Sequence, residues 1–245
     1  MGLSGYILVD FDNFFPRDFS QELIKQTLKD VVENIEGIAS LDFIQVRLYG
    51  GWYQDYAMTN RASTIVSMIP QLSFFPLIIG RKMIGGDIEL ATTLVNDDFV
   101  WGETYEEKDG IPKIIIKSSL GEACSQHGAN CPLRVLQDLT RKVSRKCGME
   151  NCEIIHRDAI KRMGQKCVDS ILVCDILTLS QDSNCNTIVI LSDDRDVHPA
   201  FVASAHAREG KRVDYYMTNR QRFDSYNTVL NRYNIHCHLY EYDTV

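Results

Sequence analysis

The sequence has no long apolar run, no leader pattern and no excess of positive charge. No apolar stretch approaches the roughly 18 residues that a membrane-spanning helix needs. The first residues lack a basic region followed by an apolar run and a small-residue cleavage site, so we expect a cytoplasmic protein. The formal net charge of -7 argues against non-specific binding of nucleic acid by the surface as a whole.

Basic side chains nevertheless outnumber acidic ones between residues 134 and 166. A basic flank of this kind suits a phosphodiester substrate. A solvated helix face has the same composition, and the sequence leaves both interpretations open.

Internal repeats and low-complexity tracts are also missing, and short apolar runs alternate with amphipathic segments. Helices are predicted at 20–34, 169–179 and 199–209. Strands are predicted at 7–10, 43–49, 76–79, 114–116, 187–191, 212–216 and 236–240. This alternation predicts an α/β fold with a doubly wound, mostly parallel sheet and helices on both faces. We expect one domain over residues 1–245, interrupted by a small insertion at about 118–156.

The predicted insertion contains four cysteines, spaced C-x6-C and C-x4-C: Cys124, Cys131, Cys147 and Cys152. Two pairs of thiolates are the ligand set of a structural Zn²⁺ site, because zinc takes four sulfur or nitrogen ligands in a tetrahedron. Both spacings are looser than the C-x2-C pairs of zinc ribbons. Scattered buried thiols are therefore the alternative interpretation.

Two of the predicted strands end in groups of acidic side chains. The first ends in Asp10, which is followed by Asp12 and Asn13, and the second is followed by Asp193, Asp194 and Asp196. In open parallel sheets ligands collect outside the carboxyl ends of the strands, and hard divalent cations prefer carboxylate oxygens. A single aspartate at such a place is often a helix cap. Five of them at two strand ends favour a metal or phosphate site, because like charges brought together need a cation between them.

A third acidic element precedes the second of these strands. Asp169 stands at the start of the predicted helix 169–179, and Asp175 lies within that helix. At a helix start the carboxylate of Asp169 can either cap backbone N–H groups or face the crevice above the sheet. The residue by itself does not decide between these roles.

Four segments together carry a resemblance to a known family: YILVDFDNF at 6–14, KCVD at 166–169, TIVILSDDRD at 187–196 and GKRVDYY at 210–216. They resemble the NYN branch of the PIN-like metal-dependent nucleases. The matching positions are Asp10, Asn13, Lys166, Asp169, Asp175, Ser192, Asp194 and Asp196. The chain departs from the pattern at Asp193, where glycine is usual, and at Val197, where phenylalanine is common.

The resemblance implies a PIN-like, Rossmannoid fold and an endonuclease that hydrolyses RNA with one or two Mg²⁺ or Mn²⁺ ions. The residues implied to hold the ions are Asp10, Asp169, Asp194 and Asp196. Those implied to orient water or the scissile phosphate are Asn13 and Asp175. RNA is the implied substrate, and family analogy also implies a homo-oligomer or a regulatory protein partner.

Two other functions compete with the nuclease. In a phosphatase of the haloacid dehalogenase type, Asp10 would be the nucleophile, Asp12 and 193–196 would complete the acidic motifs, and Lys161 or Lys166 would bind phosphate. Asn13 and the Lys-x-x-Asp helix fit the nuclease better. The other competitor is an inactive module that binds RNA or assembles with protein, although the intact acidic set speaks against lost activity.

Overall fold

A computed structural model describes residues 2–108, 131–141, 144–160, 162–207 and 209–242. The chain divides into two compact units, one formed by residues 1–105 with 165–245 and the other by residues 106–164. The second unit extends beyond the predicted insertion of 118–156 on both sides. The predicted strand at 114–116 lies outside the described residues.

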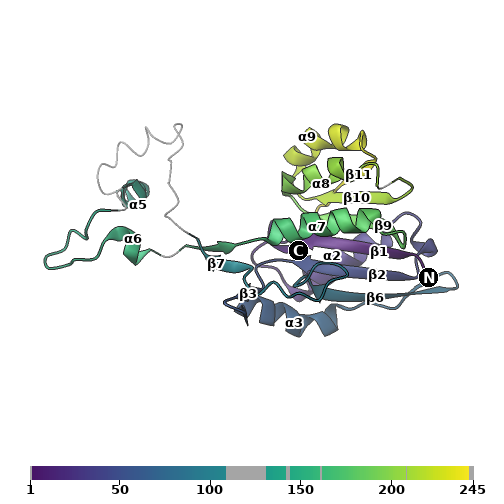
Figure 1. Ribbon diagram of the computed structural model, residues 1–245, viewed down its shortest axis with the longest axis horizontal. Coiled ribbons are helices and arrows are strands. Elements are labelled where there is room, and N and C mark those ends of the chain that lie inside the picture. The colour runs from purple at the N-terminus through teal and green to yellow at the C-terminus, as the bar shows by residue number, and fades with distance from the viewer. Residues whose placement is uncertain (1, 109–130, 142–143, 161, 208, 243–245) are drawn as a thin grey trace. The chain divides into compact units, whose positions relative to one another are not determined.

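Within the described residues, the first unit is built on a seven-stranded sheet (Figure 1). Its order across the sheet is β11 (Ile235–Leu239), β10 (Arg212–Met217), β9 (Cys185–Leu191), β1 (Ser4–Asp10), β2 (Phe43–Tyr49), β6 (Lys82–Leu90) and β5 (Leu77–Ile79). All neighbours are parallel except β5, which is antiparallel to β6. The prediction of an α/β fold with a mostly parallel sheet is confirmed.

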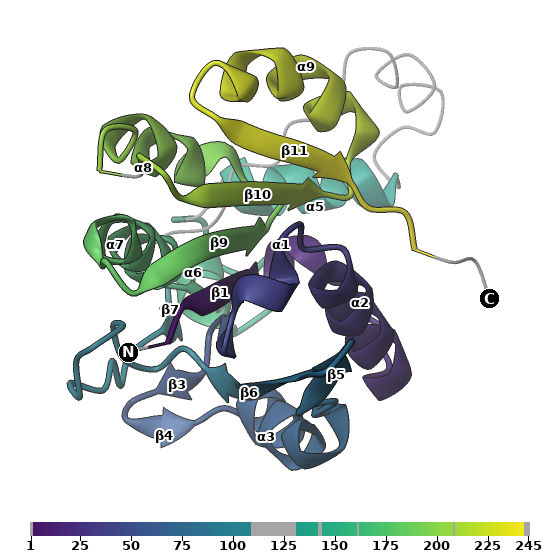
Figure 2. The same cartoon turned by 90° about the vertical axis from the view of Figure 1, so that its right-hand side faces the viewer.

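The helices of the first unit cover the two faces of this sheet. They are α1 (Phe11–Phe14), α2 (Gln21–Glu33), α3 (Asn60–Leu72), α7 (Val168–Gln181), α8 (His198–Ala203) and α9 (Arg220–Asn231). Figure 2 shows α7 and α8 on one side of the strands and α2 on the other. Short elements lie between them: η1 (Ile38–Ser40), β3 (Tyr53–Gln54), β4 (Ala57–Met58) and η3 (Arg195–Val197).

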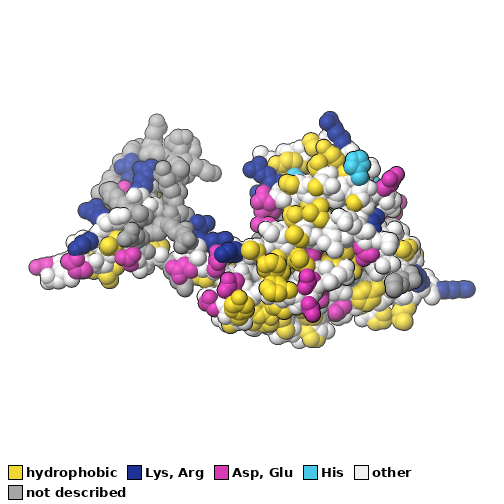
Figure 3. Space-filling model, viewed as in Figure 1, with side chains coloured by type: hydrophobic (Ala, Val, Ile, Leu, Met, Phe, Trp, Pro, Cys, Tyr) yellow, Lys and Arg dark blue, Asp and Glu magenta, His cyan; other side chains and the backbone are white. Residues whose placement is uncertain are grey.

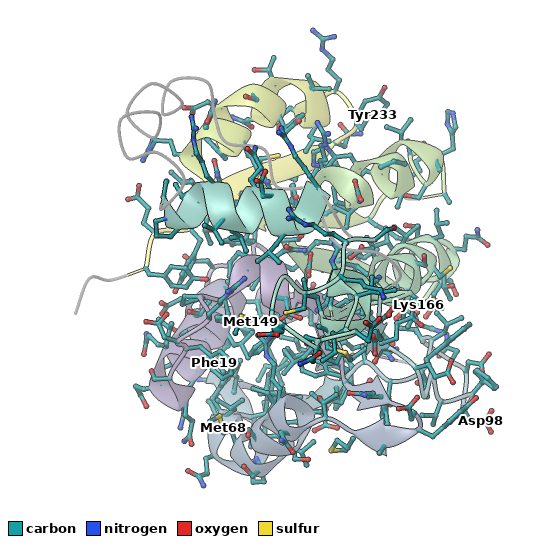
Figure 4. All side chains as sticks on the ribbon, turned by 90° about the vertical axis from the view of Figure 1, so that its left-hand side faces the viewer. Phe19, Met68, Asp98, Met149, Lys166 and Tyr233 are labelled. Atoms are coloured by element: carbon teal, nitrogen blue, oxygen red, sulfur yellow. The ribbon has the colours of Figure 1, made fainter. Side chains whose placement is uncertain are left out.

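Alternate residues of β1 enter two different cores, as the period of a strand requires. Ile7 and Val9 pack with residues of α2 and α3, whereas Leu8 packs with residues of α7. Phe19, just before α2, and Met68, on α3, pack at the edge of the first core (Figure 4). A strand that is apolar on both faces is therefore buried on both sides, as in a doubly wound sheet.

Strand β6 was not predicted, because two glycines interrupt its apolar pattern. Gly86 lies where a Cβ atom would come within 2.5 Å of the Phe75 ring. The close approach of that ring requires a residue without a side chain. The glycine is thus explained by packing against an aromatic ring, a contact that the local sequence does not reveal.

The ends of α2 follow the predicted signals closely. The Ser20 hydroxyl accepts a hydrogen bond from the Leu23 amide at 3.1 Å, which satisfies one of the free donors at the helix start. The helix predicted at 199–209 is shorter in the structure, where α8 ends at Ala203. The helices α3 and α9 were not predicted.

The second unit contains α5 (Pro132–Arg141) and α6 (His156–Ala159). The chain enters it along β7 (Tyr105–Glu107) and leaves along β8 (Met163–Gln165), and these two strands pair. Figure 3 shows Lys and Arg side chains, in dark blue, on the surface of this unit. Arg134, Arg141 and Arg145 are exposed, as both interpretations of the basic stretch require. In the described parts of both units, no helix is long and apolar enough to cross a membrane.

Leu28, on α2, tests the core between α2 and the sheet. Its side chain is fully buried, so Leu28→Ala should lower the free energy of unfolding by about 2 to 5 kcal/mol. Urea denaturation followed by circular dichroism measures this change. Lys29→Ala, at the next position, should cost less than about 1 kcal/mol, because its ion pair with Glu33 lies at the surface. Equal losses in the two variants would contradict the packing described here.

Candidate functional site

The carboxyl ends of β1 and β9 bring the two acidic strand ends together. The strands are parallel neighbours, with Val9 opposite Leu191. Asp10 therefore leaves the sheet beside Ser192, which is followed by the other acidic residues. To one side of this point the sheet continues with β2 and to the other with β10, so it is the switch point at which doubly wound sheets form a crevice.

Asp10 is the buried carboxylate of the site, with an exposed fraction of 1%. Its Oδ2 atom accepts hydrogen bonds from the Ser192 hydroxyl at 2.6 Å and from Asn13 Nδ2 at 3.0 Å. Its Oδ1 atom is also buried, and no described residue donates a hydrogen bond to it. A buried carboxylate oxygen without a donor is costly, and a bound cation would satisfy it.

The surroundings of Asp10 disfavour the ionised form of its carboxyl group. The pKa of Asp10 is raised to about 6, chiefly by burial, and the negative charges of Asp169 and Asp194 act in the same direction. The hydrogen bonds from Ser192 and Asn13 act in the opposite direction. At neutral pH the group is therefore ionised in a place that favours the neutral acid, unless a positive charge is present.

Asp194 is held in the turn that follows β9. Its backbone amide donates to the Ser192 hydroxyl oxygen at 2.9 Å, and its Oδ1 accepts from the Asp196 amide at 3.0 Å. Asn13 Nδ2 lies 3.5 Å from Asp194 Oδ2. The amide of Asn13 thus lies between the carboxylates of Asp10 and Asp194.

Asp169 and Asp196 lie at the exposed side of the same region. They line one cavity of about 860 Å³ together with Arg195, His198 and Cys174. Asp169 is in the first turn of α7, and Asp196 is in η3. The four carboxylates predicted to hold a metal therefore gather as a linked pair, Asp10 and Asp194, with the other two on the adjoining cavity wall.

These carboxylates do not converge on a single point. In the part of the chain that the structure describes, no group of three or more His, Cys, Asp or Glu side chains is arranged to hold a metal ion. The site as it stands is an acidic, partly buried crevice, and the metal remains a prediction.

Asp175 needs a correction, because the structure places it apart from this group. It is fully buried, its Oδ2 accepts from the Tyr49 hydroxyl at 2.6 Å, and its Oδ1 accepts from the Val95 amide at 2.7 Å. Arg47 Nη1 lies 3.6 Å from Oδ2. Six residues along a helix rotate by about 600°, so Asp175 faces about 120° away from Asp169. Its position supports a structural role, joining α7 to β2, rather than the orientation of water or phosphate.

Two other aspartates of the strand ends also have structural partners. Asp193 Oδ1 accepts from the backbone amides of Thr218 and Asn219, both at 3.0 Å, which fixes the turn before α9. Asp12 forms an ion pair with Arg61, whose guanidinium lies over the Phe11 ring. Neither side chain joins Asp10.

Ser192 is a residue of the candidate site to which the sequence analysis assigned no role. Its hydroxyl donates to Asp10 and accepts from the Asp194 amide, so it holds the two carboxylates in register. The signal in the sequence was the serine that directly follows the apolar run of β9, because a small hydroxyl residue there can reach the neighbouring strand end.

The proposed zinc ligands are described only in part. Cys124 lies outside the described residues. Cys131 is buried, and Cys147 and Cys152 are partly exposed. The Cys147 amide donates to the Ile154 carbonyl at 2.7 Å, and the Cys152 amide donates to the Met149 carbonyl at 3.2 Å. The zinc site stays a prediction.

Comparisons with known proteins add no family to this geometry. The chain matches no protein-family model, no curated protein and no solved structure.

The buried charge of Asp10 predicts that its removal stabilises the metal-free protein. Because the pKa of Asp10 is raised from 3.8 to about 6, its contribution to stability is present at low pH and is lost as the pH rises through about 6. At about pH 7.5, in EDTA, Asp10→Asn should raise the free energy of unfolding by about 1 to 3 kcal/mol. Near pH 4.5 the gain should largely disappear, because folded Asp10 is already protonated.

Urea denaturation at the two pH values measures this difference, with the exposed Asp98→Asn as a control that should change little at either pH. A gain of the same size at both pH values would show that charge is not its cause.

A structural role for Asp175 predicts a loss of stability that Asp169 does not share. Asp175→Ala leaves the buried Tyr49 hydroxyl and Val95 amide without their acceptor, so we expect a loss of about 3 kcal/mol. The same substitution at the exposed Asp169, on the same helix, should cost less than about 1 kcal/mol. Thermal unfolding of both variants makes the comparison. Comparable losses at the two positions would refute the assignment.

Proposed function

We propose that this protein is a metal-dependent endoribonuclease that hydrolyses RNA at the acidic crevice above β1 and β9. The observation that carries the proposal is the buried Asp10 carboxylate, whose Oδ1 lacks a donor among the described residues and whose neighbours are further carboxylates. A purely structural aspartate would gain nothing from this arrangement, whereas a cation site requires it.

The oxygen ligands of the crevice suit Mg²⁺ or Mn²⁺. Mg²⁺ usually keeps several waters and is bound by one or two carboxylates together with substrate phosphates, so three converging protein ligands are not needed beforehand. Asp10 and Asp194 would hold the ion directly, and Asp169 and Asp196 would act from the cavity wall. When bound, the ion would lower the pKa of a coordinated water and stabilise charge on the phosphate and leaving oxygen.

The other residues of the crevice position these carboxylates. Ser192 and Asn13 donate to the same oxygen of Asp10, which leaves Oδ1 directed away from both donors. Arg195 lines the cavity with Asp169 and Asp196 and supplies positive charge for a phosphate group. RNA is proposed as the substrate from the motif resemblance, as are a PIN-like fold and a homo-oligomer or regulatory partner. A cytoplasmic location is proposed as well.

The position of Asp12 favours the nuclease over the phosphatase. The phosphatase needs Asp10 and Asp12 at one reaction centre. Asp12 instead pairs with Arg61, and both line a separate cavity of about 590 Å³.

The proposal predicts RNA cleavage that requires a divalent metal and Asp194. Purified protein is incubated with labelled single-stranded and structured RNA in Mn²⁺, Mg²⁺ or EDTA. Asp194→Asn should reduce cleavage at least about 100-fold, because it removes a charge needed at the reacting phosphate. Asn13→Ala should reduce it about 10- to 100-fold, as loss of a positioning group does.

Asp98→Asn is the matched control, because Asp98 lies in an exposed loop at the periphery of the first unit (Figure 4) and the substitution changes the net charge equally. It should cleave like the unaltered protein. Cleavage that survives in EDTA or in Asp194→Asn would reject the proposed site. RNA binding without cleavage in any metal would favour the binding module.

A further inference from the structure

A third cavity, of about 480 Å³, lies in the first unit, away from the residues proposed to act in catalysis. Its walls come from the chain before α2, from α2 itself and from the segment that follows β11. The lining residues that matter here are Asp18, Glu22, Thr27, Asp30, Tyr240 and Tyr242. Its volume is within the usual range for sites that bind small molecules.

Two tyrosines form an aromatic corner in this cavity. The rings of Tyr240 and Tyr242 have centroids 5.3 Å apart and an angle of 74° between their planes. The Tyr242 hydroxyl donates to the Phe14 carbonyl at 2.5 Å, and the Tyr240 hydroxyl donates to Asp30 Oδ2 at 3.1 Å. Both hydroxyls are thus anchored, which holds the rings in place as two walls.

The charge of the cavity has one sign. Asp18, Glu22 and Asp30 line it, and none of the described lining residues is Lys, Arg or His. The Asp30 carboxylate is oriented by two donors, because Gln26 Nε2 donates to Oδ1 at 2.6 Å and Tyr240 donates to Oδ2. An anion such as RNA is therefore disfavoured here, and a cation is favoured.

The hydroxyl of Thr27 lacks a hydrogen-bond partner among the described residues, which is independent evidence for a ligand. The exposed fraction of Thr27 is 1%. A buried hydroxyl without a partner is unfavourable, and Thr27 belongs to the lining of this cavity. An N–H donor bound in the cavity would provide the partner.

We propose that this cavity binds an alkylammonium group. An ammonium on an alkyl chain combines a positive charge for the carboxylates, N–H donors for Asp30 and Thr27, and a cation for the aromatic faces of Tyr240 and Tyr242. A free polyamine and a lysine side chain of another protein offer the same chemistry. The site shares no residue with the acidic crevice, so it does not depend on the proposed nuclease activity.

Calorimetric titration of the full chain tests this proposal. The probes are spermidine, n-butylammonium and a short lysine peptide with blocked ends. The neutral controls are n-butanol and the same peptide with acetylated lysine. We expect saturable binding of the charged probes and none of the neutral controls. Tighter binding of the peptide than of spermidine would identify a lysine side chain as the ligand, and the reverse order would identify a polyamine.

Variants distinguish specific binding in the cavity from non-specific attraction of cations to a negatively charged surface. Asp30→Asn and Tyr240→Leu should each weaken binding about ten-fold, as the loss of a charged hydrogen bond or a cation–π contact does. Asp18→Asn should weaken it as well, and because Asp18 is exposed the variant is expected to fold normally. Glu33→Gln, on the same helix but outside the cavity, changes the net charge equally and should bind as the unaltered protein does.

The proposal is overturned if no charged probe binds saturably at millimolar concentration. It is also overturned if Glu33→Gln weakens binding as much as Asp18→Asn, because the attraction would then be non-specific. Neither result would bear on metal-dependent cleavage, which is measured separately.

Discussion

The parallel pairing of β1 with β9 decides where this protein can have a functional site. These strands lie far apart in the sequence, and their pairing brings Asp10 beside Ser192 and the acidic turn after it. The chain continues to β2 on one side and to β10 on the other, so helices diverge from this point and leave a crevice. The positions of Asp10 and of the acidic turn that contains Asp194 follow from this one register.

The buried, ionised carboxylate of Asp10 destabilises the fold. Asp10 is ionised at neutral pH although its surroundings raise its pKa, and two donors on one oxygen compensate only in part. Sites that act on charged substrates often contain such groups, because the unfavourable charge creates affinity for a cation. The same interaction therefore connects stability, metal affinity and the proposed chemistry.

The aspartates of the chain divide into two kinds by the partners they find. Asp175 and Asp193 accept several hydrogen bonds from the protein itself and join elements of the fold. Asp10 retains an oxygen without a described donor. Only the hydrogen-bond partners of each carboxylate distinguish the two kinds. In the sequence, all of these residues are aspartates that follow a strand or lie in a helix.

The sequence by itself determined the α/β architecture, most of the strands and the meeting of two acidic strand ends, because apolar periodicity and strand-end chemistry are local signals. It did not reveal β6, where glycines make room for Phe75, or that Asp175 turns away toward Tyr49. The tertiary structure alone decided these points, together with the linking role of Ser192 and the cavity formed by Tyr240, Tyr242 and α2. The reason is physical: each depends on which distant side chain packs against a residue, and no local pattern encodes that contact.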